Sequence, residues 1–146
     1  MKGANMPVTM KKFLELLNKD LSWEYTAMVQ YTQHSGVLTG AAYMSIKKEI
    51  ILHAQEELGH ATILAGQITF LGGFPTAEML YPCHTAKDNI KMLEQDLDGE
   101  LDAIRRYTER IAQAEELNLY HLAQNLRNIL AMEQEHAMDL QEALGR

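Results

Sequence analysis

The feature that most constrains this chain is a Glu-x-x-His pattern that occurs twice. The first copy is Glu57-Leu58-Gly59-His60, and the second is Glu133-Gln134-Glu135-His136. In a helix, residues i and i+3 project from the same face, so each copy can present a carboxylate and an imidazole to one point. We therefore predict two helices that each offer such a pair of metal ligands.

Two further glutamates keep the same register. Glu24 precedes the first copy by the same interval as Glu100 precedes the second. Four carboxylates and two imidazoles give two metal ions mainly oxygen ligands with one nitrogen each, which suits iron or manganese better than zinc or copper. The predicted metal ligands are Glu24, Glu57, His60, Glu100, Glu133 and His136.

The repeat extends to residues that flank these positions. At the offset that relates Glu57 to Glu133, Asp20-Leu21 matches Asp96-Leu97, Ala27 matches Ala103, Tyr31-Thr32 matches Tyr107-Thr108, Ala61 matches Ala137, and Leu64 matches Leu140. A single Glu-x-x-His arises by chance in acidic helical proteins, but six residues in register with their flanks do not. Each half is predicted to be one helical hairpin, and a pseudo-two-fold axis should relate the halves.

The rest of the chain favours an all-α fold. Its 146 residues suffice for one domain, 47% of them are apolar and only three are Pro. Apolar residues recur at helical spacing over about 9–37, 41–72, 87–116 and 119–144, with Thr85-Ala86-Lys87-Asp88 as the predicted start of the third helix. We predict an antiparallel four-helix bundle with an arm (1–8), a first hairpin (9–72), one long crossover (73–86) and a second hairpin (87–146).

Charge and composition exclude several classes of protein. The net charge of −7 argues against nucleic acid as a partner, since that role needs clustered Lys and Arg. The lone Cys83 excludes an internal disulfide framework and suits a reducing compartment. The segment from Met1 to Phe13 lacks the apolar region of a secretory signal, and no apolar run could cross a membrane. We expect a cytoplasmic protein with no membrane partner.

The order Glu, Glu-x-x-His, Glu, Glu-x-x-His resembles the ferritin-like di-iron carboxylate proteins, and within them is most similar to bacterioferritin. Residues 24–31, 70–75 and 129–136 resemble that family's helix motifs, and the resemblance covers about residues 10–144. It implies two iron ions per chain, with manganese possible. Glu24 and His60 would bind one ion, Glu100 and His136 the other, and Glu57 and Glu133 would bridge both.

The resemblance also implies an activity. It predicts a ferroxidase that oxidises Fe²⁺ with O₂ or H₂O₂ for iron storage or detoxification, with Glu57, Glu133, Tyr31 and Tyr107 as catalytic residues. A rubrerythrin-like peroxidase, which typically has a further Glu where this chain has Ala27 or Ala103, and a manganese catalase remain alternatives. A non-catalytic metal-binding or structural bundle is the alternative of another class.

Three positions depart from the bacterioferritin pattern. Leu58 stands where that family has its haem-ligating Met, so no haem is expected. The family's inner-face His falls at Leu52, directly before His53. The sequence ends at Arg146, shortly after His136, where the family continues into a short fifth helix. We expect a homodimer at least, with a cage of 12 or 24 subunits possible.

Other polar and aromatic residues have open roles. Tyr31 and Tyr107 either pack the bundle or donate to the ligands, and Asp20 and Asp96 either accept a second N–H from a ligating His or are solvated. His53 either guides iron or packs, and Trp23 belongs to the core or to a subunit interface. Cys83-His84 lacks partners for a zinc site.

Overall fold

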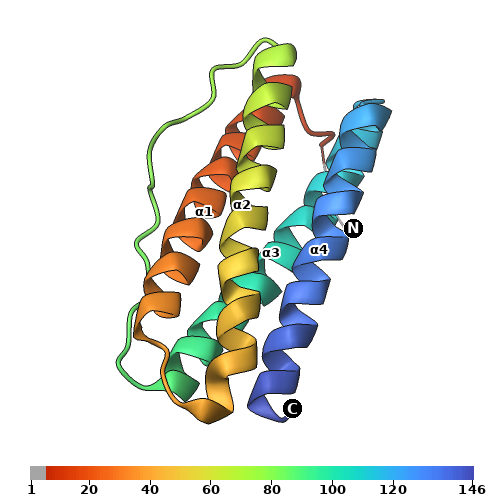
Figure 1. Ribbon diagram of the computed structural model, residues 1–146. Coiled ribbons are helices and arrows are strands. Elements are labelled where there is room, and N and C mark those ends of the chain that lie inside the picture. The colour runs from red at the N-terminus through yellow and green to blue at the C-terminus, as the bar shows by residue number, and fades with distance from the viewer. Residues whose placement is uncertain (1–5) are drawn as a thin grey trace.

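The computed structural model describes residues 6–146, which form four long helices (Figure 1). The helices are α1 (Met10–Val37), α2 (Met44–Phe70), α3 (Asn89–Glu116) and α4 (Tyr120–Leu144). The chain runs down α1 and up α2, returns along the outside of the bundle, then runs up α3 and down α4 (Figure 1). The predicted all-α four-helix bundle with one long crossover is confirmed. Of the predicted N-terminal arm, residues 1–5 lie outside the described residues.

Two of the four helices begin at a capping side chain. The Thr9 hydroxyl oxygen accepts a hydrogen bond from the Lys12 N–H at 3.1 Å, as expected for the first helix. At α3 the Asp88 carboxylate accepts from the Lys91 N–H at 2.8 Å. The predicted start at Thr85 is therefore wrong, because the acidic residue at the end of that motif is itself the cap.

The other helix ends are marked by turns, several of which contain a residue with a positive φ. A 3₁₀ turn over Ala41–Tyr43 precedes α2, so this α-helix begins at Met44 and not at the predicted Ala41. Asn118 has a φ of 59° in the short turn between α3 and α4. Gly145, with a φ of 70°, ends α4 in the left-handed conformation predicted for it.

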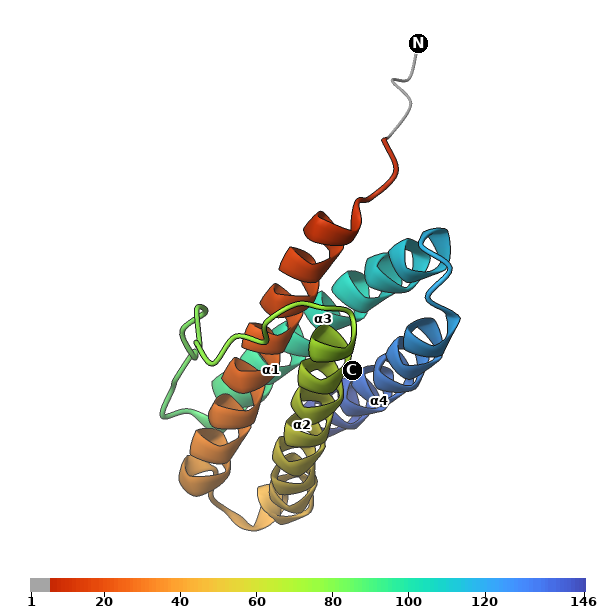
Figure 2. The ribbon, with the colours of Figure 1, turned by 90° about the horizontal axis from the view of Figure 1, so that it is seen from above.

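The crossover is fixed along α1 by a row of polar side chains at every fourth position. Each of them hydrogen-bonds to the backbone of residues 74–84; they are Asn18, Ser22, Thr26, Gln30 and His34. Trp23, which was predicted in the core or an interface, stacks on Tyr81 of the crossover with ring centroids 3.9 Å apart. The row supplies hydrogen-bond partners to the backbone of a segment that has no regular secondary structure of its own. The views from the side and from above show the crossover beside α1 (Figure 2).

Two apolar clusters fill the interior of the bundle. One includes Phe13, Leu17, Leu21, Leu64, Ile68, Leu122, Leu126 and Ile129. The other includes Leu38, Ile46, Ile50, Met92, Leu93, Leu97 and Leu140. The six predicted ligands fall between these clusters along the four helices, so packing on both sides holds a polar centre at mid-height.

Candidate metal centre

The structure brings all six predicted metal ligands together in the middle of the bundle. Each side chain is buried, and together they come from all four helices. Their ligand atoms form two groups, in each of which all atoms lie within 4.8 Å of one another. The first group is Glu24, Glu57, His60 and Glu133, and the second is Glu57, Glu100, Glu133 and His136. Glu57 and Glu133 belong to both groups.

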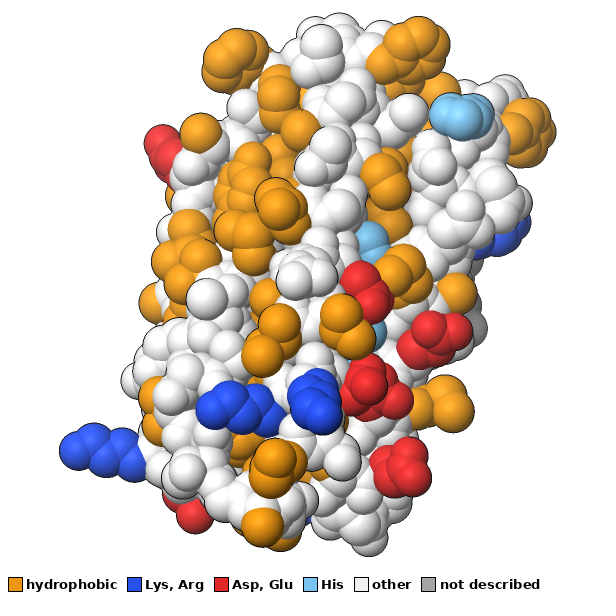
Figure 3. Space-filling model, in the orientation of Figure 1, with side chains coloured by type: hydrophobic (Ala, Val, Ile, Leu, Met, Phe, Trp, Pro, Cys, Tyr) orange, Lys and Arg blue, Asp and Glu red, His pale blue; other side chains and the backbone are white. Residues whose placement is uncertain are grey.

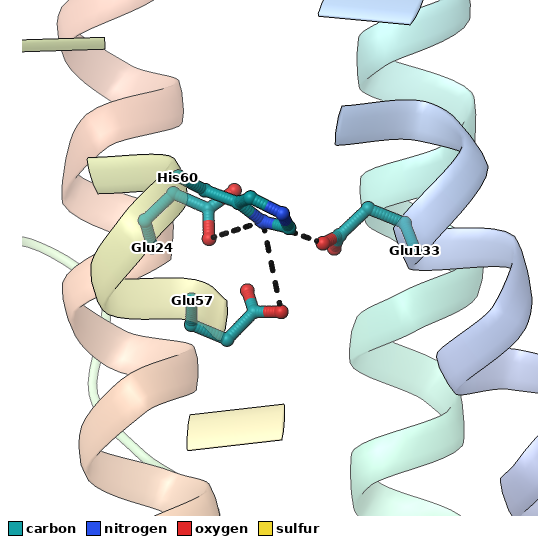
Figure 4. A group of neighbouring side chains, drawn as sticks. All are labelled: Glu24, Glu57, His60 and Glu133. Carbon is teal, nitrogen blue, oxygen red and sulfur yellow. Dashed lines mark ion pairs between the residues drawn. The ribbon is translucent and has the colours of Figure 1, made fainter. Parts of the chain in front are cut away.

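Each histidine faces the Glu-x-x-His glutamate of the opposite hairpin. The His60 Nδ1 atom lies 3.0 Å from Glu133 Oε1, and 3.7 Å from Glu24 Oε2 (Figure 4). The His136 Nδ1 atom lies 3.1 Å from Glu57 Oε1 and 3.3 Å from Glu100 Oε1. The two imidazoles thus meet the carboxylates across the bundle with the same ring nitrogen, as the repeat in the sequence predicts.

Two tyrosines hold the carboxylates that belong to one group only. Tyr31 on α1 donates its hydroxyl to Glu100 Oε1 on α3 at 2.5 Å. Tyr107 on α3 donates its hydroxyl to Glu24 Oε1 on α1. In both glutamates the second oxygen, Oε2, makes no hydrogen bond to residues 6–146. Each tyrosine therefore fixes one oxygen and leaves the other available toward the centre.

The unpaired buried atoms fit a bound metal. Seven buried side-chain N and O atoms lack a hydrogen bond within the described residues, and five of them belong to this centre. They are Glu24 Oε2, Glu57 Oε1, His60 Nδ1, Glu100 Oε2 and Glu133 Oε1. Glu57 Oε1 and Glu133 Oε1 each have an imidazole nitrogen within ion-pair distance, whereas Glu24 Oε2 and Glu100 Oε2 have no hydrogen bond at all within residues 6–146. Buried carboxylates with too few partners are costly, so the centre fits a positively charged occupant. The oxygen-rich donor set suits iron or manganese.

Burial and mutual repulsion give the centre an unusual set of pKa values. Burial, followed by the negative charge of neighbouring glutamates, raises the pKa of Glu57 and of Glu133 well above the ordinary range. Burial opposes the charged form of His60 and His136, but hydrogen bonds and charges of the glutamates prevail and raise their pKa values to about 10 and about 9. Without metal, the centre therefore retains protons at neutral pH.

The pKa of Glu24 is lowered, in contrast to those of Glu57 and Glu133. Burial raises the pKa of this carboxyl, but its polar contacts with Glu57 and His60 outweigh burial, so the pKa falls to about 2. Glu24 therefore carries its charge over the whole neutral range. The tyrosines stay protonated, because burial and then the neighbouring Glu100 and Glu24 charges raise the pKa of Tyr31 and of Tyr107, respectively. They remain hydrogen-bond donors at neutral pH.

The outer nitrogens of the two histidines have different partners. The His136 Nε2 atom lies 2.8 Å from Glu56 Oε2, whereas the His60 Nε2 atom lies 3.4 Å from Met132 Sδ. Glu56 and Met132 are equivalent under the internal repeat. Nothing in the sequence pattern had singled out either residue, although each directly precedes a predicted ligand.

Asp20 and Asp96 do not accept from the ligating histidines, so that prediction is wrong. Asp20 accepts from Arg110 Nε at 2.7 Å and from Arg106. Asp96 lies 2.9 Å from His34 Nδ1 and accepts from Gln30. Both aspartates lie one turn before a ligand and are buried. A buried carboxylate needs partners, and here side chains of the neighbouring helix supply them in place of the ligating histidines.

A cavity of about 420 Å³ connects the centre with the surface between α1, α3 and the crossover. Four of the six predicted ligands line its inner end, namely Glu24, Glu57, Glu100 and Glu133. Its lining carries charged side chains of both signs, with Asp98 and Asp102 beside Lys91 and Arg106, and Asp102 is paired with Arg106 at 2.9 Å.

Comparison with known proteins identifies the family. A family model described as a ferritin-like domain matches residues 14–146. The bacterioferritin of Brucella melitensis is 33% identical over 125 residues, which cover 86% of this chain and 78% of that protein. This chain belongs to the ferritin-like family. The family resemblance predicted from the sequence is thereby confirmed.

Solved structures of ferritin-like proteins agree with this membership. A ferritin-like di-iron-carboxylate protein of Bacillus anthracis matches with a TM-score of 0.88 and 34% identity, covering 95% of this chain and 99% of that chain. The bacterioferritin-related protein of Bacteroides fragilis, described as a dodecameric thioferritin, matches with a TM-score of 0.87 and 32% identity. That match covers 94% of this chain and 87% of the other.

The remaining predicted residues of this ferritin-like protein are not members of the two ligand groups. Leu58 is on the outside of α2, with 53% of its surface exposed. His53 is buried and stacks on His136, with ring centroids 3.9 Å apart. Within residues 6–146, neither Cys83 nor His84 belongs to a group of potential metal ligands. None of the helices described here has the length and apolar character needed to cross a bilayer.

Proposed function

We propose that this protein is a ferroxidase that binds two Fe²⁺ ions per chain and oxidises them with O₂ or H₂O₂. The observation that carries the proposal is that the two ligand groups share Glu57 and Glu133. A carboxylate common to both groups can bridge two ions, and bridging holds the ions close enough to give up electrons to one oxidant. Glu24 with His60, and Glu100 with His136, would be the terminal ligands of the two ions.

The chain's own residues would orient the ligands and manage protons. Tyr31 and Tyr107 hold Glu100 and Glu24 so that one oxygen of each faces the centre. The protons retained by Glu57, Glu133 and the two imidazoles must leave when these groups become ligands. The apolar clusters close the centre along the bundle axis, while the cavity between α1, α3 and the crossover leaves it open to the side.

The electron balance fits two substrate ions. Two Fe²⁺ lose one electron each, and these electrons with two protons reduce either O₂ to H₂O₂ or H₂O₂ to two waters. Manganese remains compatible with the same donors. The ferritin-like di-iron-carboxylate description of the Bacillus anthracis protein favours iron. Ala27 and Ala103 stand where a rubrerythrin-like site would have a further carboxylate, which favours ferroxidase over peroxidase.

Anaerobic titration with Fe²⁺ followed by exposure to air tests the proposal. We expect saturation at two ions per chain and rapid oxidation in the parent protein, and loss of rapid oxidation in Glu57→Ala and Glu133→Ala. Glu135→Ala is the matched control, because Glu135 is an exposed neighbour on α4 outside both ligand groups. Oxidation at the parent rate in either of the first two variants would contradict the bridging roles. Absence of saturable binding would favour a non-catalytic bundle.

We also propose that the protein is a homo-oligomer whose two-fold contact involves α1 and α2. Large apolar side chains are exposed on these helices, including Val29, Val37, Met44, Ile51, Leu52, Leu58 and Ile63. Orange side chains on the left of the face in Figure 3 show part of this surface. Because this chain is similar to a dodecameric protein, a closed shell of twelve subunits is the larger assembly that we consider beside the dimer.

Light scattering measures this assembly directly. The chain mass is 16.6 kDa, so a dimer has twice this mass and a shell of twelve subunits has twelve times this mass. A particle with the mass of a closed shell would indicate storage of the oxidised iron. A dimer would indicate detoxification of iron or peroxide. A monomer at micromolar concentration would contradict the contact through α1 and α2.

A further inference from the structure

The two metal positions of the proposed centre are nearly alike on the side that would face the ions. His60 Nδ1 lies 3.0 Å from Glu133 Oε1, and His136 Nδ1 lies 3.1 Å from Glu57 Oε1. Each carboxylate that belongs to one ligand group only accepts a hydrogen bond from a tyrosine of the opposite hairpin. Because the inner contacts match, each half of the repeat is a reference for the other, and a difference between the positions is expected from residues outside these contacts.

The outer sides of the two histidines do differ. A histidine that binds a metal through Nδ1 carries its proton on Nε2, so this nitrogen donates outward. The acceptor for His136 is the Glu56 carboxylate, with Nε2 and Oε2 2.8 Å apart. The acceptor for His60 is the Met132 thioether, with Nε2 and Sδ 3.4 Å apart. Glu56 and Met132 occupy equivalent positions of the repeat, so the difference lies at one pair of residues.

These two acceptors have unequal effects on an imidazole. A hydrogen bond from an N–H to a carboxylate is charge-assisted and roughly twice as strong as a bond between neutral groups. A thioether sulfur is only a weak acceptor. A carboxylate on the outer nitrogen fixes the ring and makes the inner nitrogen more basic, and loss of such a partner typically lowers metal affinity by about 10–100-fold. The outer contacts therefore favour the position at His136.

A ring contact adds to this difference. The His53 ring stacks on the His136 ring, with centroids 3.9 Å apart. The residue equivalent to His53 in the repeat is Ile129, which has no ring to stack on His60. The His136 ring is thus held on one face and at its outer nitrogen before any metal binds. A ligand held in place beforehand loses less freedom on binding.

Packing does not require a methionine at position 132. Met132 is half-buried, and the side chain of its counterpart Glu56 is 35% exposed. A carboxylate at this place keeps contact with solvent, so its charge is not costly to hold. The bundle accommodates a glutamate here in one half, and the methionine in the other half is a difference that packing alone does not impose.

We propose that Glu56 and Met132 make the two metal positions unequal, so that the position at His136 holds its ion tightly and the position at His60 exchanges its ion. Both are positioning residues, because they act through an imidazole. One consequence rests on the proposed ferroxidase function: the ion at His136 stays in the protein, and the ion at His60 leaves after oxidation. The difference in affinity itself does not rest on that function.

Anaerobic titration with Co²⁺, followed by calorimetry, tests the difference without oxidation chemistry. Met132→Glu gives one half the residue that the other half has, and we expect it to tighten the second binding step by about 10–100-fold. Glu56→Met is the reverse exchange and should weaken the first step by a similar factor. Glu109→Met is the matched control, since it makes the same exchange at an exposed position of α3 outside both ligand groups, and it should change neither step.

The double variant, Glu56→Met with Met132→Glu, separates positioning from a general loss of structure. It moves the carboxylate to the other half, so the two steps should again lie as far apart as in the parent, whereas each single exchange brings them closer. Repulsion between two bound ions also separates the steps, so the change caused by each exchange is the decisive result. Unchanged steps in Met132→Glu or in Glu56→Met would overturn the proposal. Binding that responds as expected but is followed by no rapid oxidation in air would contradict the ferroxidase function and leave the unequal positions standing.

Discussion

At the scale of single residues, the two metal positions of the proposed centre differ on their outer side. The outer nitrogen of His136 meets the carboxylate of Glu56, whereas that of His60 meets the sulfur of Met132. A carboxylate at this place makes an imidazole a stronger donor, and a thioether does so much less. The ion at His136 should therefore be held more tightly than the ion at His60.

Leu58 leads to a prediction about haem. It occupies the position at which bacterioferritin has its haem-ligating Met, and a leucine side chain has no atom that can bind iron. We expect the purified protein to lack a stoichiometric Soret band in its absorption spectrum. The variant Leu58→Met is the gain-of-function counterpart, since Leu58 is exposed on α2 and the swap nearly preserves volume. A full Soret band in the parent protein would contradict the prediction.

The sequence could predict which residues meet in the centre, and it offered Tyr31 and Tyr107 as possible donors to them, but it could not predict their other partners. Six side chains repeated in register specify one point, because helical spacing fixes which face each occupies. The partners of Asp20 and of the outer His nitrogens depend on how the helices are rotated against one another. Arg110 reaches Asp20 from α3, far away along the chain. No local pattern encodes such a contact.

At the scale of elements, α1 has two functions on two faces. One face carries Glu24 and Tyr31 into the centre, and the other carries the row of polar side chains that binds the crossover. Sequence patterns predicted the helix and its cap because these depend on local spacing and on Thr9. The polar row is regular in sequence too, since its members lie four residues apart. Its partners, however, are backbone atoms of the crossover, and their positions depend on the whole fold.

Gln30 provides a test of this row. Its amide oxygen accepts from the His84 N–H at 2.8 Å, and its amide nitrogen donates to Asp96 at 2.9 Å. Gln30→Ala leaves both partners short of a hydrogen bond, so the free energy of unfolding should fall by about 1–3 kcal/mol. Chemical denaturation measures this change. Gln33→Ala, an exposed glutamine on the same helix, is the control and should change little.

At the scale of the whole molecule, the bundle holds together buried carboxylates that repel one another when no metal is bound. Four carboxylates lie buried between two apolar clusters, and the raised pKa values of Glu57 and Glu133 are the direct result. Protons partly replace the missing positive charge in the metal-free protein. The fold and the centre are therefore coupled, because whatever binds the centre also stabilises the bundle.

This coupling predicts how stability depends on pH. A group whose pKa is raised in the folded state stabilises the fold below its unfolded pKa and loses that effect as pH rises. Glu57 and Glu133 have raised values, as do His60 and His136 at about 10 and about 9. Glu24, lowered to about 2, has the opposite sign but acts only at acid pH. The metal-free protein should therefore become less stable as pH rises from about 5 to about 9.

Metal binding should oppose this decline in stability with rising pH. The ligating forms of these groups are deprotonated, so Mn²⁺ competes with protons and binds more tightly at higher pH. We expect the rise in melting temperature caused by saturating Mn²⁺ to be larger at about pH 8.5 than at about pH 6, as measured by circular dichroism. Glu57→Gln removes one of the raised carboxyl groups, so its metal-free form should show a shallower decline with pH. An equal metal-induced shift at both pH values would show that the buried protons are not displaced by the metal.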